Sequence, residues 1–493
     1  MKVLKTNPGA KRLIESLRNM GYDCSTAIAD LVDNSVTAHA SEIYIDILPK
    51  EGSRPALIYI ADNGKGMDKD NLHEAMRFGS FQEYAEGDLG KYGLGLKTAS
   101  LSQCRKLTVS SKAKSSGDAR PRRNCMRWDL DHVYKSDEWD LLIPSEDEFK
   151  DWESKLLNQE VVREHGTVVL WEKLDESLPM LSSDNANERE KQMARLINEI
   201  SSHLRMIFHR FMQGTVTGRR KLDIYVCGEK LVPWDPFCRT EKTKELDIVG
   251  INLTFQLSDS TKVKETITIS PFVLPREDEF SSTEAWRDAS GPKNWNQQQG
   301  FYFYRNNRLL QAGGWSRMRA VDEHLKLLRV AVDFSNELDQ AFSINVTKMK
   351  AKVPDDLREK IAKHLTAWMK VANTRYRRIP VATTHHSTLS TPTFRDIEPI
   401  PEPASSVSIG PLKFSHSVGK KFEIAENKKT GEITLSIPDG HELSAVFQLR
   451  SGDKESLRKM CLSTLALLEA VHDKKIAPTN IPIKELKKIY RNI

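Results

Sequence analysis

The chain has 493 residues, more than one hydrophobic core usually organises, so two or three domains are expected. Hydrophobic residues make up 39% and charged residues 29%, and no apolar run reaches the roughly 18 residues that cross a bilayer. We therefore expect a cytoplasmic protein. The six cysteines form no C-x-x-C pair, which indicates reduced thiols rather than a zinc site. The net charge of +6 permits contact with nucleic acid without arguing for it.

The first 185 residues alternate between helical and strand periodicity. Helices are predicted over 8–20 and 25–39, with strands over 43–47 and 57–61. Further strands are predicted at 106–111, 124–130 and 166–171. Helices combined with a hairpin-connected sheet predict an α+β fold, a two-layer α/β sandwich rather than a doubly wound sheet.

The rest of the chain divides at a long amphipathic helix predicted over 186–212. After it we predict strands at 222–227, 251–256, 264–270 and 301–304 and helices at 317–329 and 355–377. A Thr-, Ser- and Pro-rich stretch then has linker composition. In the terminal module, strands are expected near 421–425 and 431–436 and helices at 454–473 and 482–490. The expected domains are 1–185, a connecting helix at 186–214, a second α/β domain at 215–380, a linker at 381–410 and a small interaction module at 411–493.

The first motif is A-I-A-D-L-V-D-N-S at 27–35. Asp30 and Asn34 are four residues apart and share one helix face. Asn34 can offer a carbonyl oxygen to Mg²⁺, and Asp30 can orient or deprotonate a water aimed at a γ-phosphate. A surface acidic helix is the alternative.

The second motif follows the strand that ends at Asp62. A buried carboxylate there can accept the exocyclic amine of adenine. Gly64 and Gly66 let the backbone approach a ring closely, and Met67 offers an adaptable apolar surface to the base. A plain Asn-Gly turn is the alternative.

The third motif is a glycine-rich segment before a helix predicted to begin near Lys97. Its residues are Gly90, Lys91, Tyr92, Gly93, Leu94 and Gly95. Glycine-rich backbone at a helix start exposes N–H groups to a phosphate, and Lys97 adds a point charge. The segment lacks the features of a Rossmann or Walker loop, and a flexible connector is the alternative.

In this order and spacing, the three motifs resemble the GHKL ATPase superfamily, whose fold is the Bergerat sandwich. Within it, G-K-Y-G-L-G-L-K-T-A-S and G-T-V-V-L-W are most similar to the MORC group and its prokaryotic relatives. The resemblance assigns the water-activating position to Asp30, the Mg²⁺ ligand to Asn34, adenine recognition to Asp62 and the phosphate lid to 90–97. It also places Thr167 near the adenine-binding aspartate. The family usually has glutamate where this chain has Asp30, so slow hydrolysis is expected as an alternative to normal turnover.

The resemblance further implies a β-α-β transducer domain that sends a lysine to the γ-phosphate. Lys348 is the candidate and Lys350 the fallback, against a solvated basic loop. Arg305 and Arg308, in the aromatic strand segment 301–310, are either structural or contact a partner. The basic clusters at 219–221 and 375–378 are open between helix-end stabilisation and nucleic-acid contact.

We therefore expect an ATP-binding, Mg²⁺-dependent ATPase whose lid closure and homodimerisation form a clamp, with duplex DNA as client in DNA handling or defence against foreign DNA. That client rests on family analogy alone. The alternatives are a chaperone-like ATPase and a slow nucleotide-gated scaffold that serves a partner protein through its C-terminal module. A histidine kinase is disfavoured because no histidine precedes the first motif.

Overall fold

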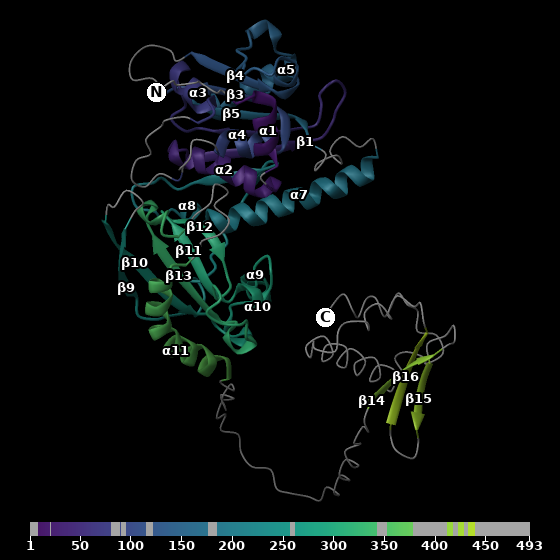
Figure 1. Cartoon of the computed structure of the whole chain (residues 1–493), viewed down its shortest axis with the longest axis vertical. Coiled ribbons are helices and arrows are strands. Elements are labelled where there is room, and N and C mark those ends of the chain that lie inside the picture. Colours follow the sequence, from purple (N-terminus) through teal and green to yellow (C-terminus); the bar gives the residue numbers. More distant parts are fainter. Residues whose placement is uncertain are drawn as a thin grey trace, which may run out of the picture. The chain divides into compact units, whose positions relative to one another are not determined.

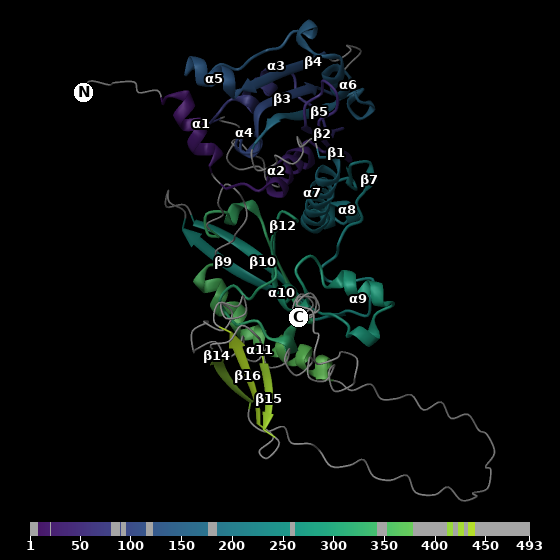
Figure 2. The ribbon, with the colours of Figure 1, turned by 90° about the vertical axis from the view of Figure 1, so that its right-hand side faces the viewer.

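The computed structural model describes residues 8–19, 21–79, 89, 95–114, 122–175, 185–256, 262–342, 353–377, 412–417, 423–427 and 432–438. The chain forms two compact units, Met1–Thr383 and Thr384–Ile493. The first unit holds two sheets with their helices, seen from two sides in Figure 1 and Figure 2. Among the described helices, none combines the length and the apolar character that crossing a bilayer requires.

The first sheet has seven strands in the order β4-β3-β5-β2-β1-β6-β7. Their bounds are β1 Glu42–Leu48, β2 Leu57–Asp62, β3 Cys104–Lys112, β4 Arg123–Asp129, β5 Gly166–Leu174, β6 Asp223–Val226 and β7 Glu229–Lys230. All neighbours run antiparallel except β1 and β6. Each strand predicted from the first 185 residues is present, which confirms the α+β sandwich expected from the alternating patterns.

The helices of this part of the chain cover both faces of the first sheet. They are α1 Ala10–Arg18, α2 Cys24–Thr37, α3 Lys69–Met76, α4 Gly95–Leu101, α5 Leu130–Ser136, α6 Asp151–Leu157, α7 Ala186–Ile207 and α8 His209–Gln213, with 3-10 turns at Glu146–Glu148 and Glu160–Val162. Apolar side chains of α1, α2, α4 and α7 form one core with alternate residues of the sheet. The intervening sheet residues pack on the other face against Leu157 of α6 and Val162. The period of two along the strands therefore builds two separate apolar layers.

Helix α2 is the central element of the larger layer. Asp23 caps it by accepting a hydrogen bond from the Thr26 amide at 2.7 Å. All but two of its residues are buried, and one of the exceptions is Asn34. The alternative of a surface acidic helix is therefore wrong, because Asp30 lies inside the core layer.

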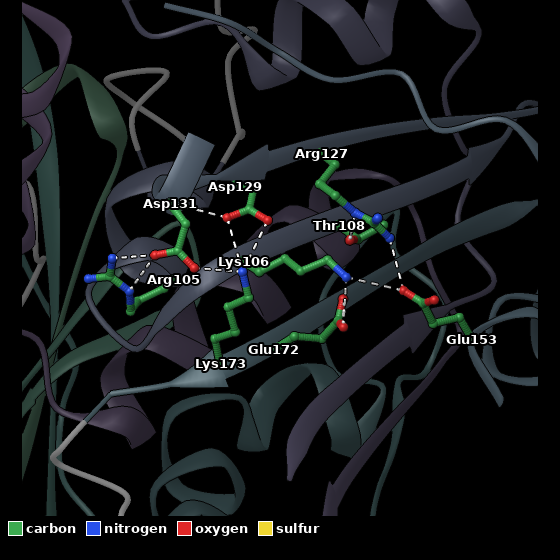
Figure 3. A network of polar contacts seen from close by, with 9 residues as sticks. All are labelled: Arg105, Lys106, Thr108, Arg127, Asp129, Asp131, Glu153, Glu172 and Lys173. Atoms are coloured by element: carbon green, nitrogen blue, oxygen red, sulfur yellow. Dashed lines mark hydrogen bonds and ion pairs between the residues drawn. The ribbon is translucent and has the colours of Figure 1, made fainter. Parts of the chain in front are cut away.

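A polar network ties α6 to β3, β4 and β5 (Figure 3). Lys106 Nζ donates to Glu172 Oε1 at 2.9 Å and lies 3.4 Å from Glu153 Oε1. Arg127 Nη2 donates to the same Glu153 oxygen at 3.0 Å. Both glutamates are buried, and burial raises the pKa of Glu172 against the lowering effect of Lys106. A second group at the strand ends joins Arg105, Lys173, Asp129 and Asp131.

The second sheet has six strands in the order β12-β11-β13-β10-β8, with β9 paired to β10. Their bounds are β8 Lys244–Glu245, β9 Val249–Gln256, β10 Lys262–Val273, β11 Gly300–Arg305, β12 Arg308–Ala312 and β13 Leu328–Phe334. The helices are α9 Thr283–Ala289, α10 Trp295–Gln298 and α11 Asp355–Arg377, with 3-10 turns at Glu277–Glu279, Glu323–Leu325 and Asn336–Leu338. Strands β11 and β13 are parallel neighbours, buried almost throughout. Apolar residues of α11 complete this core.

One prediction for the second half is wrong, and one confirmed strand joins a different sheet from the one expected. The helix expected over 317–329 is absent: the segment holds a 3-10 turn and the start of β13. Residues 317–324 are exposed or partly exposed whereas 327–329 are buried, so burial along the segment does not follow the helical period. The strand expected near 222–227 is β6, which pairs with β1 in the first sheet rather than in the second domain.

The C-terminal unit contains a small sheet in the order β14-β16-β15. Its strands are β14 Leu412–Ser417, β15 Glu423–Asn427 and β16 Glu432–Pro438. The two strands predicted for this module are confirmed as β15 and β16. The helices predicted over 454–473 and 482–490 lie outside the described residues.

Candidate nucleotide-binding site

Asp30 lies on the buried face of α2 and both of its carboxylate oxygens have neighbours. Tyr22 Oη donates to Asp30 Oδ2 at 2.9 Å. Arg308 Nη2 lies 3.7 Å from Asp30 Oδ1, beyond hydrogen-bond distance but close enough for direct Coulombic attraction. Burial and the Asp30 charge together raise the pKa of Tyr22 well above its usual range, so the phenol stays a donor at neutral pH.

Asn34 is one turn further along α2 and is exposed. Within the described residues its carboxamide makes no hydrogen bond, so its oxygen is available to a ligand. A single protein oxygen suits Mg²⁺, which keeps several waters and takes its other ligands from substrate phosphates. The residue present therefore fits the ion that the motif implies.

Asp62 ends β2 and is buried. Its oxygens accept hydrogen bonds from the Gly64 amide and the Ser35 hydroxyl, both at 2.8 Å. Burial raises the pKa of Asp62 to about 6, while these two hydrogen bonds and His165 act in the opposite direction. Because Ser35 belongs to α2, the same helix carries Asp30 and fixes the Asp62 carboxylate.

Thr167 lies directly opposite Asp62 in the antiparallel pairing of β2 and β5. Its hydroxyl is 2.8 Å from Ser111 Oγ, which also accepts a hydrogen bond from the Met67 amide at 2.9 Å. The sequence predicted that Thr167 and Asp62 lie close together, and the strand register places them side by side. Met67 is partly buried against the main core.

Gly66 has a reason to be glycine that involves no ligand. Its φ is +63°, and a Cβ there would lie 1.9 Å from the Lys112 carbonyl oxygen. Gly64 is also crowded, since a Cβ would lie 2.8 Å from both Ala38 Cβ and Asp62 Oδ1. The second motif is therefore a turn packed against α2 and β3, and its adenine-binding role stays a prediction.

The third motif falls partly outside the described residues, which exclude 90–94 and so Gly90, Lys91, Tyr92, Gly93 and Leu94. Gly95 begins α4, and a Cβ on it would lie 3.8 Å from Asp30 Oδ2. The glycine segment therefore enters its helix beside the first motif. Lys97 is buried, and its ammonium donates to the Ala75 carbonyl at 2.8 Å. Burial lowers the pKa of Lys97 to about 8.

Asp33 and Arg308 are the residues that sequence reasoning did not connect. Arg308 Nε donates to Asp33 Oδ1 at 2.8 Å across 275 positions of sequence, and both side chains are at most 2% exposed. The second acid in A-D-L-V-D-N-S was the available signal, because an aspartate on the buried side of a helix requires a partner.

Arg305 belongs to the same hairpin and is also buried. It forms a two-pronged ion pair with Asp339, at 2.6 and 2.8 Å, and donates to the Leu89 carbonyl at 3.0 Å. Both arginines therefore make contacts within this chain. Of the two alternatives left open for them, these contacts favour the structural role over contact with a partner. Lys348 and Lys350 lie outside the described residues.

Some residues of the two basic clusters also make contacts within this chain. Arg375 binds Glu279, the Val273 carbonyl and the Lys242 carbonyl, so it cross-links the second domain. Arg219 donates to the Val36 carbonyl at the end of α2 at 3.0 Å. These contacts favour the structural interpretation of both arginines over nucleic-acid contact.

A cavity of about 710 Å³ borders the second motif at Asn63. Tyr44, Tyr59 and His165 are among its lining residues, and Tyr59 belongs to the smaller apolar layer rather than to the layer of α2. It is thus on the other face of the first sheet from Asp30.

Residues 22–167 match the family described as histidine kinase-, DNA gyrase B- and HSP90-like ATPase. This part of the chain is therefore similar to a GHKL-type ATPase domain. The matched segment begins at Tyr22 and ends at Thr167, and so contains Asp30, Asn34 and Asp62.

Solved structures that match this chain include the N-terminal domain of a DNA repair protein, at 15% identity and a TM-score of 0.38, covering 74% of this chain and 97% of that one. Another is the MutL ATPase domain of Aquifex aeolicus complexed with ADP, at 14% identity and a TM-score of 0.29, covering 64% of this chain and 94% of that one. No curated protein matches the sequence.

Proposed function

We propose that this chain binds ATP with Mg²⁺ and hydrolyses it. The observation that carries the proposal is the position of α2, which joins the three motifs: its Asp30 is beside Gly95, its Ser35 fixes Asp62, and its Asn34 is exposed one turn from Asp30. Similarity to a GHKL-type ATPase domain over the same residues supports it.

Bound ATP supplies the phosphoanhydride bond that is cleaved. Asp62 accepts the exocyclic amine of adenine, which requires the ionised carboxylate. Asn34 offers its carboxamide oxygen to Mg²⁺. Asp30 orients a water and accepts its proton as attack begins. The backbone of the glycine segment and the Lys97 ammonium serve the phosphates, and Lys348 is proposed as the second-domain contact to the γ-phosphate.

Slow turnover is the second candidate and a specific observation favours it. Asp30 is one methylene shorter than glutamate, and Tyr22 and Arg308 already occupy the surroundings of its two oxygens. Tyr22 donates a hydrogen bond to Asp30 Oδ2, and a carboxylate that accepts a hydrogen bond is a weaker base. A nucleotide-gated scaffold that rarely turns over fits this arrangement.

The clamp is the broader proposal. Closure of the glycine segment over ATP and homodimerisation would enclose a client, with duplex DNA as the client and a MORC-like task in DNA handling or defence. This step rests on the sequence resemblance. A chaperone-like ATPase is the alternative, and the C-terminal unit is proposed to bind a partner.

The test is Mg²⁺-dependent phosphate release with Asp30→Asn as the key variant. We expect the variant to lose at least about 100-fold in kcat, because a general base contributes this much, while nucleotide affinity is retained. Asp70→Asn, an exposed aspartate in the first turn of α3, is the matched control and keeps activity. Unchanged turnover in Asp30→Asn would remove Asp30 as the base. Stimulation of phosphate release by duplex DNA would favour the DNA clamp over the chaperone, and affinity that falls with salt would indicate phosphate contacts.

A further inference from the structure

The hairpin of β11 and β12 places a cation inside the ATPase domain. The Arg308 side chain and the Asp30 and Asp33 carboxylates are all at most 2% exposed. A charge buried to this degree is retained only with paired charges and hydrogen bonds, so the three groups act as one unit. The Phe208 ring, 5.9 Å from the guanidinium, packs on the same side chain and restricts it further.

The two carboxylates are held differently. Asp33 accepts a hydrogen bond from Arg308 Nε at 2.8 Å, whereas Asp30 is 3.7 Å from Nη2. Asp33 is therefore the anchor of the guanidinium. Asp30 is attracted electrostatically to the guanidinium, and its short hydrogen bond comes from Tyr22. Tyr22 on Oδ2 and Arg308 near Oδ1 then determine how the Asp30 carboxylate is turned.

We propose, on the basis of the hydrolysis proposed above, that Arg308 is a positioning residue for Asp30, anchored by Asp33. It acts from β12 and therefore makes the orientation of the Asp30 carboxylate depend on the second sheet. Any shift of the hairpin relative to α2 changes the Nη2–Oδ1 separation, and with it the position of the group that activates water.

The same hairpin also contacts the start of the glycine segment. Arg305, three residues before Arg308, donates to the Leu89 carbonyl, and Leu89 directly precedes Gly90. The hairpin that carries Arg308 is thereby joined to Leu89. This connection is separate from a lysine on the γ-phosphate, because it exists without any contact to nucleotide.

Other charged groups nearby are few among the described residues. His203 on α7 faces Arg308, and its pKa is lowered to about 4, chiefly by burial, so it is neutral at pH 7. Lys97 on α4 points its ammonium at Ala75. Tyr22 and Asp33 also belong to this group. Arg308 lies within ion-pair distance of Asp30.

The test compares Asp33→Asn with the double variant Asp33→Asn/Arg308→Met. In Asp33→Asn, the asparagine oxygen still accepts a hydrogen bond from Arg308 Nε. The double variant differs from it only in lacking the guanidinium, and neither protein contains the buried Asp33 charge. We expect the double variant to lose about 10- to 100-fold in kcat, with nucleotide affinity little changed. The acid limb of its kcat–pH profile should also move up by about one pH unit, since the cation favours ionised Asp30.

A second readout uses the protein without nucleotide. Arg308→Met alone leaves the buried carboxylates of Asp30 and Asp33 without this cation. It should therefore unfold at a lower temperature than the double variant, which removes the Asp33 charge as well. Arg210→Met is the matched control. Arg210 pairs with Asp333 of β13 and stacks 3.5 Å from the Tyr304 ring, but the contacts found for it involve no residue of the first motif. It should loosen the packing of α8 on the second sheet and leave the pH profile unchanged.

The outcomes separate the two proposals. Equal kcat and an unshifted acid limb in the double variant would overturn the role of Arg308, and so would the same pH shift in Arg210→Met. Absence of rescue by Asp33→Asn in the unfolding experiment would overturn the anchor. A wild-type protein that binds ATP without releasing phosphate would instead overturn the hydrolysis, and this inference with it.

Discussion

Asp62, the residue proposed to bind adenine, carries a cost in stability. Its carboxylate is buried, and burial raises the pKa to about 6, above the usual value of 3.8. Between these two pH values the folded protein binds more protons than the unfolded chain, so this group's contribution to stability falls as pH rises through about 6. At neutral pH the buried charge therefore costs about 3 kcal/mol in the free energy of unfolding.

Asp62→Asn should separate the two effects. We expect the variant to lose ATP binding, because the amide cannot replace the carboxylate toward the adenine amine without a donor clash. Its unfolding temperature at pH 7.5 should rise above that of the wild type, and the gain should vanish near pH 4. Isothermal titration and thermal unfolding across pH measure both. Retained ATP affinity would remove Asp62 from adenine recognition.

ATP affinity itself should fall on the acid side in the wild-type protein. As pH drops through about 6, Asp62 becomes protonated and stops accepting the adenine amine. Titrations with ATP and with the triphosphate of a purine that lacks this amine distinguish the cause, since only ATP should lose affinity through this group. A parallel loss for both nucleotides would point to the phosphates instead.

At the scale of elements, the turn after β2 is fixed by contact with β3. Gly66→Ala would bring a Cβ to 1.9 Å from the Lys112 carbonyl at a φ of +63°. Gly52→Ala is the matched control, with a φ of +55° and no neighbouring atom within 4 Å among the described residues. The control should lose only the left-handed strain of about 1–2 kcal/mol, and Gly66→Ala distinctly more. Denaturant unfolding measures the difference, and equal losses would mean that the turn relaxes.

The network in Figure 3 predicts a second stability effect at this scale. Lys106→Met leaves Glu153 and Glu172 buried with less compensation, so we expect a loss of about 3 kcal/mol, the usual cost of breaking a buried pair. Adding Glu172→Gln should recover part of it. Urea unfolding of the single and double variants measures this coupling, and an additive result would show that the pair does not interact.

For the whole molecule, the clamp makes a prediction about assembly. A non-hydrolysable ATP analogue with Mg²⁺ should convert the protein to a dimer in light scattering, and ADP should not. Asn34→Ala, which removes the proposed Mg²⁺ ligand, should weaken this response, whereas Asp70→Asn should not. A protein that stays monomeric with saturating analogue would contradict the clamp and leave nucleotide binding in place.

Local patterns were enough for much of this protein. The helix that carries Asp30 and Asn34, the strand that ends at Asp62 and the strand that opens at Gly166 are all where their periodicity predicts. Such features are encoded within a few residues, because side-chain period and turn chemistry act over one or two turns of chain. The nucleotide motifs are of the same local kind, so the sequence by itself indicated an ATPase domain.

Contacts between distant segments were decided only by the tertiary structure. Arg308 and Asp33 are 275 positions apart, and neither segment alone contains a signal of their pairing. Strand β6 joins the first sheet through β1, and the segment predicted as a helix over 317–329 holds a 3-10 turn and the start of β13, because partners and burial select among conformations that local patterns leave open. The sequence determined that an acid and an amide share one face of α2, whereas packing of the second sheet determined which cation faces that acid.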